Sequence, residues 1–577
     1  MSVAESAPDN PLPAVQPATA PRWLERLARR PYALLALLGL LLWLPGIVSL
    51  PALDRDESRF AQSSRQMVQS GDLVDIRFGQ VPRYKKPAGI YWLQSASTAL
   101  LGMGHDNRIW TYRVPSLLGA IATSWLTFWC AIAFAGGVAA LLSGALMLGT
   151  VLLTAEASIA TTDAVLQACI VAVMAVLLRV YRRARDPDAP SPSTRMVMFG
   201  WAALALGVLV KGPVAPAVAL ATILALSAWD REIGWLGALK PVRGFLLLLV
   251  LVLPWLVAIT IQSNGAFFQQ SLGNDFAAKL AGGQESHGAP PGYYLALSAA
   301  AFFPAILFVL PGVAQGIARR ADPAIRFLLV WAASWWIAVE IAPTKLPHYV
   351  LPAYPALAIL AALFVIAPQA ARGMTTARWI AALQFLAGAL LLAAAPILLP
   401  HLYGEGVPWW LMALAALGLM LALAALVLSL RRQMVPAVAA ALLAMLVLVP
   451  TLTMGAGPRL TQLWITERLK PLVAAGSHPG DPPPALAGYQ EPSMVFALGK
   501  DVLLTDGKGA AEAGARMGGL ALVEDQELGG FLARLAELQA DAAPQAEVSG
   551  FNYSRGRKVH VTIFRVARLH DPREPRR

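Results

Sequence analysis

The chain has 577 residues, of which 57% are hydrophobic and only 14% are charged. A soluble globular domain has about 45–50% apolar and about 25% charged residues, so a large soluble enzyme is excluded. The net charge of +12 fits basic loops that flank membrane spans, and we expect no nucleic-acid partner. Cys130 and Cys169 both lie within apolar runs, which argues against a disulfide framework or a cysteine zinc site. These features predict a polytopic α-helical membrane protein.

The amino-terminal segment, residues 1–31, is rich in Pro and Ala and ends in a stretch with four arginines. The apolar run that follows, residues 32–50, is longer than the apolar region of a signal peptide and has no clear cleavage site after it. We interpret this run as an uncleaved first span. Its basic flank predicts that residues 1–31 form a cytoplasmic tail.

Apolar blocks at about 20 residues per span predict about thirteen spans within a transmembrane domain of residues 32–455. Those after the first lie near residues 114–135, 138–154, 163–180, 196–210, 213–229, 243–262, 293–316, 327–342, 349–367, 379–399, 408–429 and 434–453. The first outer loop, residues 51–113, holds nine Lys and Arg, although positive charge belongs on the cytoplasmic side. Binding of an anionic substrate is a physical reason for this exception.

Residues 456–577 have ordinary polarity and predict a small α/β domain on the non-cytoplasmic side of the membrane. Residues 493–498 and 501–504 are interpreted as short strands. The pair Gly529-Gly530 predicts a break before a helix over residues 531–540. Residues 548–564 predict a hairpin, because the second half alternates between polar and apolar side chains.

Ionisable residues from distant segments fall at the outer ends of the predicted spans or in outer loops. They are Asp56, Glu57, Arg59, Lys85, Lys86, Asp163, Lys211, Lys279, His287, Lys345 and His348. The cytoplasmic loops, in contrast, hold mainly arginines that set topology. This clustering predicts an active site or ligand cavity at one surface of the bilayer.

The richest segment predicts an amphipathic helix that starts near Asp56 and Glu57, where the helix dipole favours carboxylates. One interpretation is an interfacial helix with ordinary acids at its start. The functional interpretation makes one carboxylate a general base and Arg59 a phosphate ligand.

Two other segments also combine cations with aromatic or histidine side chains. Lys85 and Lys86 precede the pair Tyr91-Trp92, which fits either an aromatic membrane anchor or a clamp on a lipid phosphate. Residues 343–355 contain Lys345, His348 and four prolines, which weaken a helix at the start of a span. A purely structural span would gain nothing from this composition.

Three single residues leave the choice between structure and function open. Asp163 is either a site residue or the cap of the span that follows it. Lys211 is either a site residue or a snorkelling lysine. His287 is either a ligand or a solvated loop residue. The sequence has no HExxH, P-loop, GxSxG or spaced Cys/His cluster, so ATP-driven transport, zinc proteolysis and serine-hydrolase chemistry lack support.

Taken together, these segments resemble the aminoarabinose-transferase-like, polyprenyl-phosphate-dependent glycosyltransferases of the protein O-mannosyltransferase (GT-C) superfamily. The resemblance runs in order from about residue 32 into the tail. Its motifs are Asp56-Glu57-x-Arg59-Phe60-Ala61, Ser70-Gly71-Asp72, Lys86-Pro87, Tyr91-Trp92, Lys211-Gly212-Pro213, Lys345-Leu-Pro-His-Tyr-x-Leu-Pro-Ala-Tyr-Pro and Pro492-Ser493.

The resemblance implies a GT-C fold with a periplasmic α/β domain, in the bacterial inner membrane. It implies transfer of a sugar, with inversion, from a polyprenyl-phosphate donor to lipid A, another lipopolysaccharide or a glycan. Asp56 would be the catalytic carboxylate, supported by Glu57 and Arg59, and Lys86 would contact the donor phosphate. The remaining substrate-binding residues would be Asp163, Lys211, Lys279, His287, Lys345, His348 and Tyr349.

The resemblance also bears on metal binding. Members of this group can carry a glutamate metal ligand just before the lysine that matches Lys86, and here that position is Lys85. His287 matches a histidine of the same site, but the exchange of an acid for a base argues against a bound divalent metal. It also favours a sugar or acceptor other than aminoarabinose and lipid A.

Two alternatives to this function remain: a protein acceptor for a transferase of the same fold or, in a different class, a polytopic lipid or sugar transporter.

Overall fold

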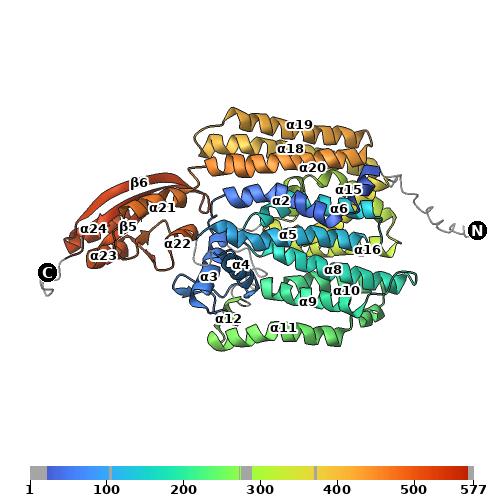
Figure 1. The fold of residues 1–577 in the computed structure, drawn as a ribbon, viewed down its shortest axis with the longest axis horizontal. Coiled ribbons are helices and arrows are strands. Elements are labelled where there is room, and N and C mark those ends of the chain that lie inside the picture. The colour runs from blue at the N-terminus through green and yellow to red at the C-terminus, as the bar shows by residue number, and fades with distance from the viewer. Residues whose placement is uncertain (1–21, 103–106, 272, 274–288, 369–372, 570–577) are drawn as a thin grey trace, which may run out of the picture.

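The computed structural model describes residues 22–102, 107–271, 273, 289–368 and 373–569 as a bundle of helices with a mixed α/β domain at one end (Figure 1). Ten helices of the described residues are long and apolar enough to cross a membrane, or eleven if one bent pair is a single span. Two shorter apolar helices also belong to the bundle. The chain is a multi-pass membrane protein.

Every apolar block of the sequence forms helix. The first half of the bundle contains α2 (Pro31–Ser49), α5 (Ile109–Ala131), the bent pair α6 (Gly137–Leu148) and α7 (Val151–Ala157), α8 (Asp163–Arg185), α9 (Thr194–Lys211), α10 (Val214–Asp230) and α11 (Pro241–Gln262). The short helices α1 (Arg22–Leu27), η1 (Gly234–Leu239) and α12 (Ala266–Phe268) flank them.

The second half of the bundle follows the same pattern. It contains α14 (Tyr293–Ala301), α15 (Ile306–Ala318), α16 (Pro323–Ile341), η3 (Pro347–Ala353), α17 (Tyr354–Ile366), α18 (Met374–Tyr403), α19 (Trp409–Leu430) and α20 (Met434–Pro450), with the turns η4 (Thr451–Ala456) and η5 (Gly457–Arg459). The proline-rich residues 343–355 separate α16 from α17. Within this segment, η3 forms a 3₁₀ helix in place of regular α-helix.

The helices differ in how much protein surrounds them. In the apolar stretch of α8, 89% of the residues are buried inside the protein, and in the span formed by η3 and α17 the share is 83%. Both spans therefore lie at the centre of the bundle. In the apolar stretch of α11, only 22% of the residues are buried, and α11 forms one edge of the bundle (Figure 1). The helices α18, α19 and α20 form a layer on the opposite side.

The segment between α2 and α5, the predicted first outer loop, contains two helices and a small hairpin. These are α3 (Asp56–Ser70), α4 (Gly89–Leu100), β1 (Arg77–Phe78) and β2 (Val81–Pro82). As expected from its acidic start, α3 begins at Asp56. It lies between the bundle and the carboxy-terminal domain (Figure 1).

The carboxy-terminal domain has one mixed sheet with strand order β4-β3-β5-β7-β6. Its elements are α21 (Ile465–Gly476), β3 (Ala485–Ala487), α22 (Pro492–Leu498), β4 (Leu503–Thr505), α23 (Gly507–Met517), β5 (Gly519–Glu524), α24 (Asp525–Leu538), β6 (Ala542–Asn552) and β7 (Arg557–Val566). The strands β3, β4 and β5 are parallel, and the hairpin β6–β7 adds to β5 in antiparallel orientation.

The structure confirms the predicted hairpin and corrects two other predictions in the tail. Residues 493–498 form the helix α22, not a strand. A short apolar run fits either structure, and Pro492 at its first turn favours a helix. Gly529 and Gly530 do not separate the predicted helix from the residues before it. They lie inside α24, which starts at Asp525.

Candidate active site

Asp56, the first residue of α3, presents an exposed carboxylate. Its side chain is 67% exposed, and Oδ1 lies 3.4 Å from Nη2 of Arg83 and 3.8 Å from Nη1 of Arg59. The guanidinium of Arg83 in turn stacks on the ring of Phe60, 5.3 Å from its centroid. Two arginines therefore orient Asp56 while leaving it accessible to a ligand. Arg83 was not among the residues singled out from the sequence.

Glu57 has a different environment from its neighbour, because its carboxylate is buried against Arg113. Nε and Nη2 of Arg113 donate to the two carboxylate oxygens of Glu57, both at 2.8 Å. The same carboxylate accepts hydrogen bonds from the backbone N–H groups of Leu53, at 2.9 Å, and Ala160, at 2.7 Å. Glu57 thus joins the start of α3 to α5 and to the connection between α7 and α8. Its geometry suits a positioning role, whereas the sequence predicted contact with the substrate.

Asp163 and Lys211 form an ion pair between two central helices. Asp163 begins α8 and Lys211 ends α9, and Nζ of Lys211 lies 2.5 Å from Oδ1 of Asp163. Their side chains are only 10% and 12% exposed, so the pair is largely shielded from solvent. The pair excludes a simple snorkelling lysine, because Lys211 points to Asp163 within the protein.

Two glycines allow the helices to meet at this point. A Cβ on Gly119 would lie 2.8 Å from the backbone of Ala164, directly after Asp163. A Cβ on Gly89, at the start of α4, would lie 2.7 Å from the carbonyl oxygen of Leu209. These close backbone approaches bring α5 against the start of α8, and the start of α4 against the end of α9.

His348 lies between two carboxylates. Its Nε2 is 3.8 Å from Oδ1 of Asp163, and its Nδ1 is 3.8 Å from Oε1 of Glu156. Glu156 is buried in α7 and accepts a hydrogen bond from Thr161 Oγ1 at 3.0 Å. Sequence reasoning missed Glu156, although a single acid at the end of an apolar block is a signal for a functional residue.

Electrostatic interactions connect these residues to the first outer loop. Asp56 interacts through space with both Glu156 and His348, Lys86 interacts with His348, and Tyr349 interacts with Lys211. We call the set the polar cluster. It consists of Asp56, Lys86, Glu156, Asp163, Lys211, His348 and Tyr349.

The polar cluster occupies one end of the bundle. From Asp163 to Arg185, α8 has 23 residues, which separates its two ends by about 33 Å. At the far end, Asp230 pairs with Arg185 at 3.0 Å and with Arg326 at 2.6 Å. The arginines there neutralise acids of the protein itself, whereas the polar cluster exposes the carboxylate of Asp56.

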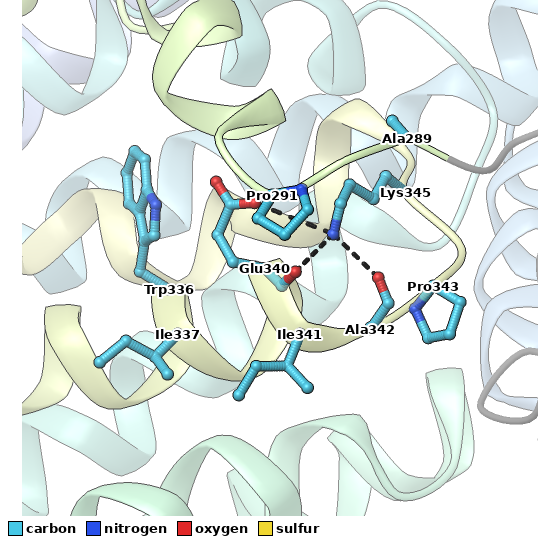
Figure 2. Close-up of a pocket in the computed structure, with 9 residues that line it drawn as sticks. All are labelled: Ala289, Pro291, Trp336, Ile337, Glu340, Ile341, Ala342, Pro343 and Lys345. Atoms are coloured by element: carbon cyan, nitrogen blue, oxygen red, sulfur yellow. Dashed lines mark hydrogen bonds and ion pairs between the residues drawn. The ribbon is translucent and has the colours of Figure 1, made fainter.

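Lys345 lies apart from these contacts. Its Nζ donates to the carbonyl oxygens of Glu340, at 2.6 Å, and Ala342, at 2.9 Å, and lies 3.8 Å from the Glu340 carboxylate. It therefore caps the end of α16. Beside it is a surface pocket of about 500 Å³ that is lined mainly by apolar side chains of α16 and of the segment around Pro291 (Figure 2).

Lys279 and His287 lie outside the described residues. Among the residues that the structure describes, no group of three or more His, Cys, Asp or Glu side chains could hold a metal ion. The side chain of Lys85 is exposed and offers an ammonium where a metal site would need an acid.

Comparisons with known proteins agree with this architecture. The profile of the dolichyl-phosphate-mannose-protein mannosyltransferase family matches residues 33–265. An undecaprenyl phosphate-α-4-amino-4-deoxy-L-arabinose arabinosyl transferase of Pectobacterium carotovorum subsp. carotovorum is 28% identical over 385 residues. A homologue from Enterobacter sp. is 27% identical over 338 residues. The first match covers 65% of this chain and 65% of that relative, and the second covers 57% and 59%.

Solved structures share the fold over nearly the whole chain. The crystal structure of ArnT from Cupriavidus metallidurans bound to undecaprenyl phosphate matches with a TM-score of 0.75 at 20% identity, covering 96% of this chain and 100% of that one. An archaeal oligosaccharyltransferase from Archaeoglobus fulgidus matches with a TM-score of 0.53 at 12% identity, covering 91% and 70%. The chain therefore has the fold of these membrane glycosyltransferases and is similar in sequence to the dolichyl-phosphate-mannose-protein mannosyltransferase family and to aminoarabinose transferases.

Proposed function

We propose that this protein is an inverting glycosyltransferase that moves a sugar from a polyprenyl-phosphate donor to an envelope acceptor, namely lipid A, another lipopolysaccharide or a glycan. The observation that carries the proposal is the exposed carboxylate of Asp56, which shares one end of the bundle with Lys86, Lys211 and His348. The similarity to arabinosyl transferases that use undecaprenyl phosphate supports this donor class.

In the proposed reaction, the acceptor oxygen bonds to the anomeric carbon as the bond from that carbon to the phosphate oxygen breaks. The polyprenyl phosphate leaves with the electron pair of the broken bond. Because phosphate is a leaving group of low basicity, cationic side chains suffice to stabilise its developing charge, and no strong general acid is needed. Lys86 and Lys211 are the cations of the polar cluster that we assign to this role.

Asp56 would act on the opposite reactant. When the acceptor is a hydroxyl group, the carboxylate of Asp56 takes its proton as the new bond forms, and Arg59 and Arg83 hold the carboxylate in position. Glu57 serves as a positioning residue, since all its described contacts are with the protein. Attack from the face opposite the leaving phosphate inverts the anomeric carbon.

The proposed topology places residues 1–31 in the cytoplasm, residues 32–455 in the inner membrane and residues 456–577 in the periplasm. The arginine-rich end of α8 would face the cytoplasm, as the positive-inside rule requires. The polar cluster would then meet its donor and acceptor at the periplasmic surface. The proposed reaction uses no metal, because Lys85 stands where the resemblance places an acidic ligand.

Mass spectrometry of lipid A, core oligosaccharide and envelope glycans tests the proposal. Cells that carry the wild-type gene are compared with cells that carry Asp56→Ala at equal membrane abundance. We expect the variant to lose one defined sugar mass, which would also identify the acceptor. Unchanged envelope glycans with a folded variant would count against the proposal and favour a protein acceptor or transport.

A further inference from the structure

The residue before Asp56 has an unusual backbone conformation. Arg55 has φ +66° and ψ −119°, a backbone conformation that residues other than glycine rarely adopt. Such a conformation persists only where surrounding contacts hold it. The direction in which α3 starts, and with it the direction of the Asp56 carboxylate, therefore depends on those contacts.

Glu57 holds the start of α3 from the side of the bundle, and two further contacts come from the carboxy-terminal domain, almost 500 residues further along the chain. The hydroxyl oxygen of Tyr553 accepts a hydrogen bond from the backbone N–H of Asp54 at 2.7 Å. The guanidinium of Arg55 donates to the carbonyl oxygen of Ser554. Tyr553 and Ser554 follow β6 directly, so the turn between β6 and β7 contacts both Arg55 and the residue before it.

The β6–β7 turn is itself firmly anchored. Nδ2 of Asn552 donates to Oε1 of Glu491 at 2.8 Å, and these two residues are only 2% and 5% exposed. Arg555 lies 3.4 Å from the same Glu491 oxygen. The ring of Tyr553 packs edge-on against Trp464, with the centroids 6.3 Å apart. These contacts hold the turn, and with it Tyr553, to the rest of the carboxy-terminal domain.

We propose that Tyr553 is a positioning residue of the transferase site, through which the carboxy-terminal domain fixes the backbone of Asp54 and Arg55 and so aims the carboxylate of Asp56. The inference rests on the proposed function, because it assumes that Asp56 meets the acceptor. It adds that the carboxy-terminal domain contributes to turnover without touching the reacting atoms.

The test compares Tyr553→Phe with Tyr403→Phe in the purified full-length protein. Both changes remove one hydroxyl, and Tyr403 lies at the end of α18, where its ring packs on Phe551 of β6 with the centroids 5.4 Å apart. For Tyr553→Phe we expect kcat to fall about tenfold or more, since a misplacement of about 1 Å can cost up to about a hundredfold. The KM for the polyprenyl-phosphate donor should stay within about twofold, and Tyr403→Phe should match the wild type.

Amide hydrogen exchange of the peptide that covers residues 53–60 gives a second readout that needs no turnover. Exchange should be faster in Tyr553→Phe and unchanged in Tyr403→Phe, with the same melting temperature for both proteins. Wild-type exchange, or faster exchange with wild-type kcat, would overturn the inference. A fall in kcat without faster exchange would also overturn it, because Tyr553 would then act by another route.

Failure of the proposed function has a different signature. In that outcome, Asp56→Asn keeps the wild-type rate, while the exchange difference between Tyr553→Phe and Tyr403→Phe remains. The contact between the domains would then be real, but it would not serve catalysis through Asp56, and the positioning role would be rejected.

Discussion

Glu57 and Arg113 form a buried two-point ion pair that connects the first outer loop to the membrane bundle. Both hydrogen bonds measure 2.8 Å, and the side chains are 2% and 0% exposed. Arg113 also donates to the carbonyl oxygens of Ile47, Leu50 and Pro51 at the end of α2. One guanidinium therefore joins α2, α3 and α5 directly below Asp56.

Removing one partner of this pair should unfold the site. Glu57→Gln leaves the Arg113 charge buried without its counter-ion, a change that costs about 3–5 kcal/mol of unfolding free energy. We expect a clear drop in melting temperature and in membrane yield. The control is Arg534→Ala, which breaks the exposed pair with Glu512 and should leave the melting temperature unchanged. Equal melting curves for Glu57→Gln and wild type would contradict the assigned role.

The pair of Asp163 and Lys211 allows stability and activity to be separated. Lys211→Met alone strands a buried carboxylate and should destabilise the protein. Adding Asp163→Asn removes that charge and should restore the melting temperature. Transfer should nevertheless stay about a hundredfold or more below wild type, because the phosphate loses one stabilising cation. A double variant with the wild-type rate would show that Lys211 only balances Asp163.

The junction between the domains should weaken as pH rises. Burial raises the pKa of Asp54 from 3.8 to about 6, repulsion from Glu491 adds to the effect, and hydrogen bonds from Ser493 and Tyr553 oppose it. The unfolded chain releases this proton near pH 4, whereas the folded protein keeps it until about pH 6. Folding therefore loses on the order of 3 kcal/mol between these pH values, and the full penalty applies above pH 6.

Asp54→Asn measures this contribution. The variant should melt at a higher temperature than wild type at pH 7.5, and the difference should shrink towards pH 5. Thermal unfolding of both proteins across this range gives the result. A difference that does not change with pH would contradict the raised pKa of Asp54.

Transfer should not depend on a divalent metal. The exposed ammonium of Lys85 stands where a ligand would have to be, so we expect the chelated protein to keep its rate. Turnover is measured before and after exhaustive treatment with EDTA, and again after zinc is added back. A loss on chelation that zinc reverses would show that a site exists, with ligands beyond those described.

Much of the fold could be predicted because hydrophobic length is a direct physical requirement of the bilayer. Each apolar block became helix, including the pairs separated only by Gly136-Gly137 and by Lys211-Gly212-Pro213. The carboxy-terminal domain was harder to predict, because the hydrophobic pattern of a six-residue apolar run such as residues 493–498 is too short to distinguish a helix from a strand. Its packing against α3 and Tyr112 is a tertiary effect.

The site was predictable where a polar side chain stood out from its surroundings. Asp163 contacts both Lys211 and His348, and Asp56, Lys86 and Tyr349 lie near enough to interact with this group electrostatically. Arg83, Arg113 and Glu156 were missed because their importance lies in their partners, which come from distant segments. Lys345 was predicted to bind substrate because it is a conspicuous lysine at the end of a span, but it caps α16, the helix before it.

The most direct test of the central claim is the rate at which purified protein releases polyprenyl phosphate from a polyprenyl-phosphate sugar in the presence of the acceptor that mass spectrometry identifies. Asp56→Asn is compared with wild type and with Asp188→Asn, a change at an exposed position in the turn that follows α8. We expect Asp56→Asn to lower the rate about a hundredfold or more with an unchanged melting temperature, and Asp188→Asn to match wild type. Equal rates for Asp56→Asn and wild type would contradict the assignment of Asp56 as the catalytic carboxylate.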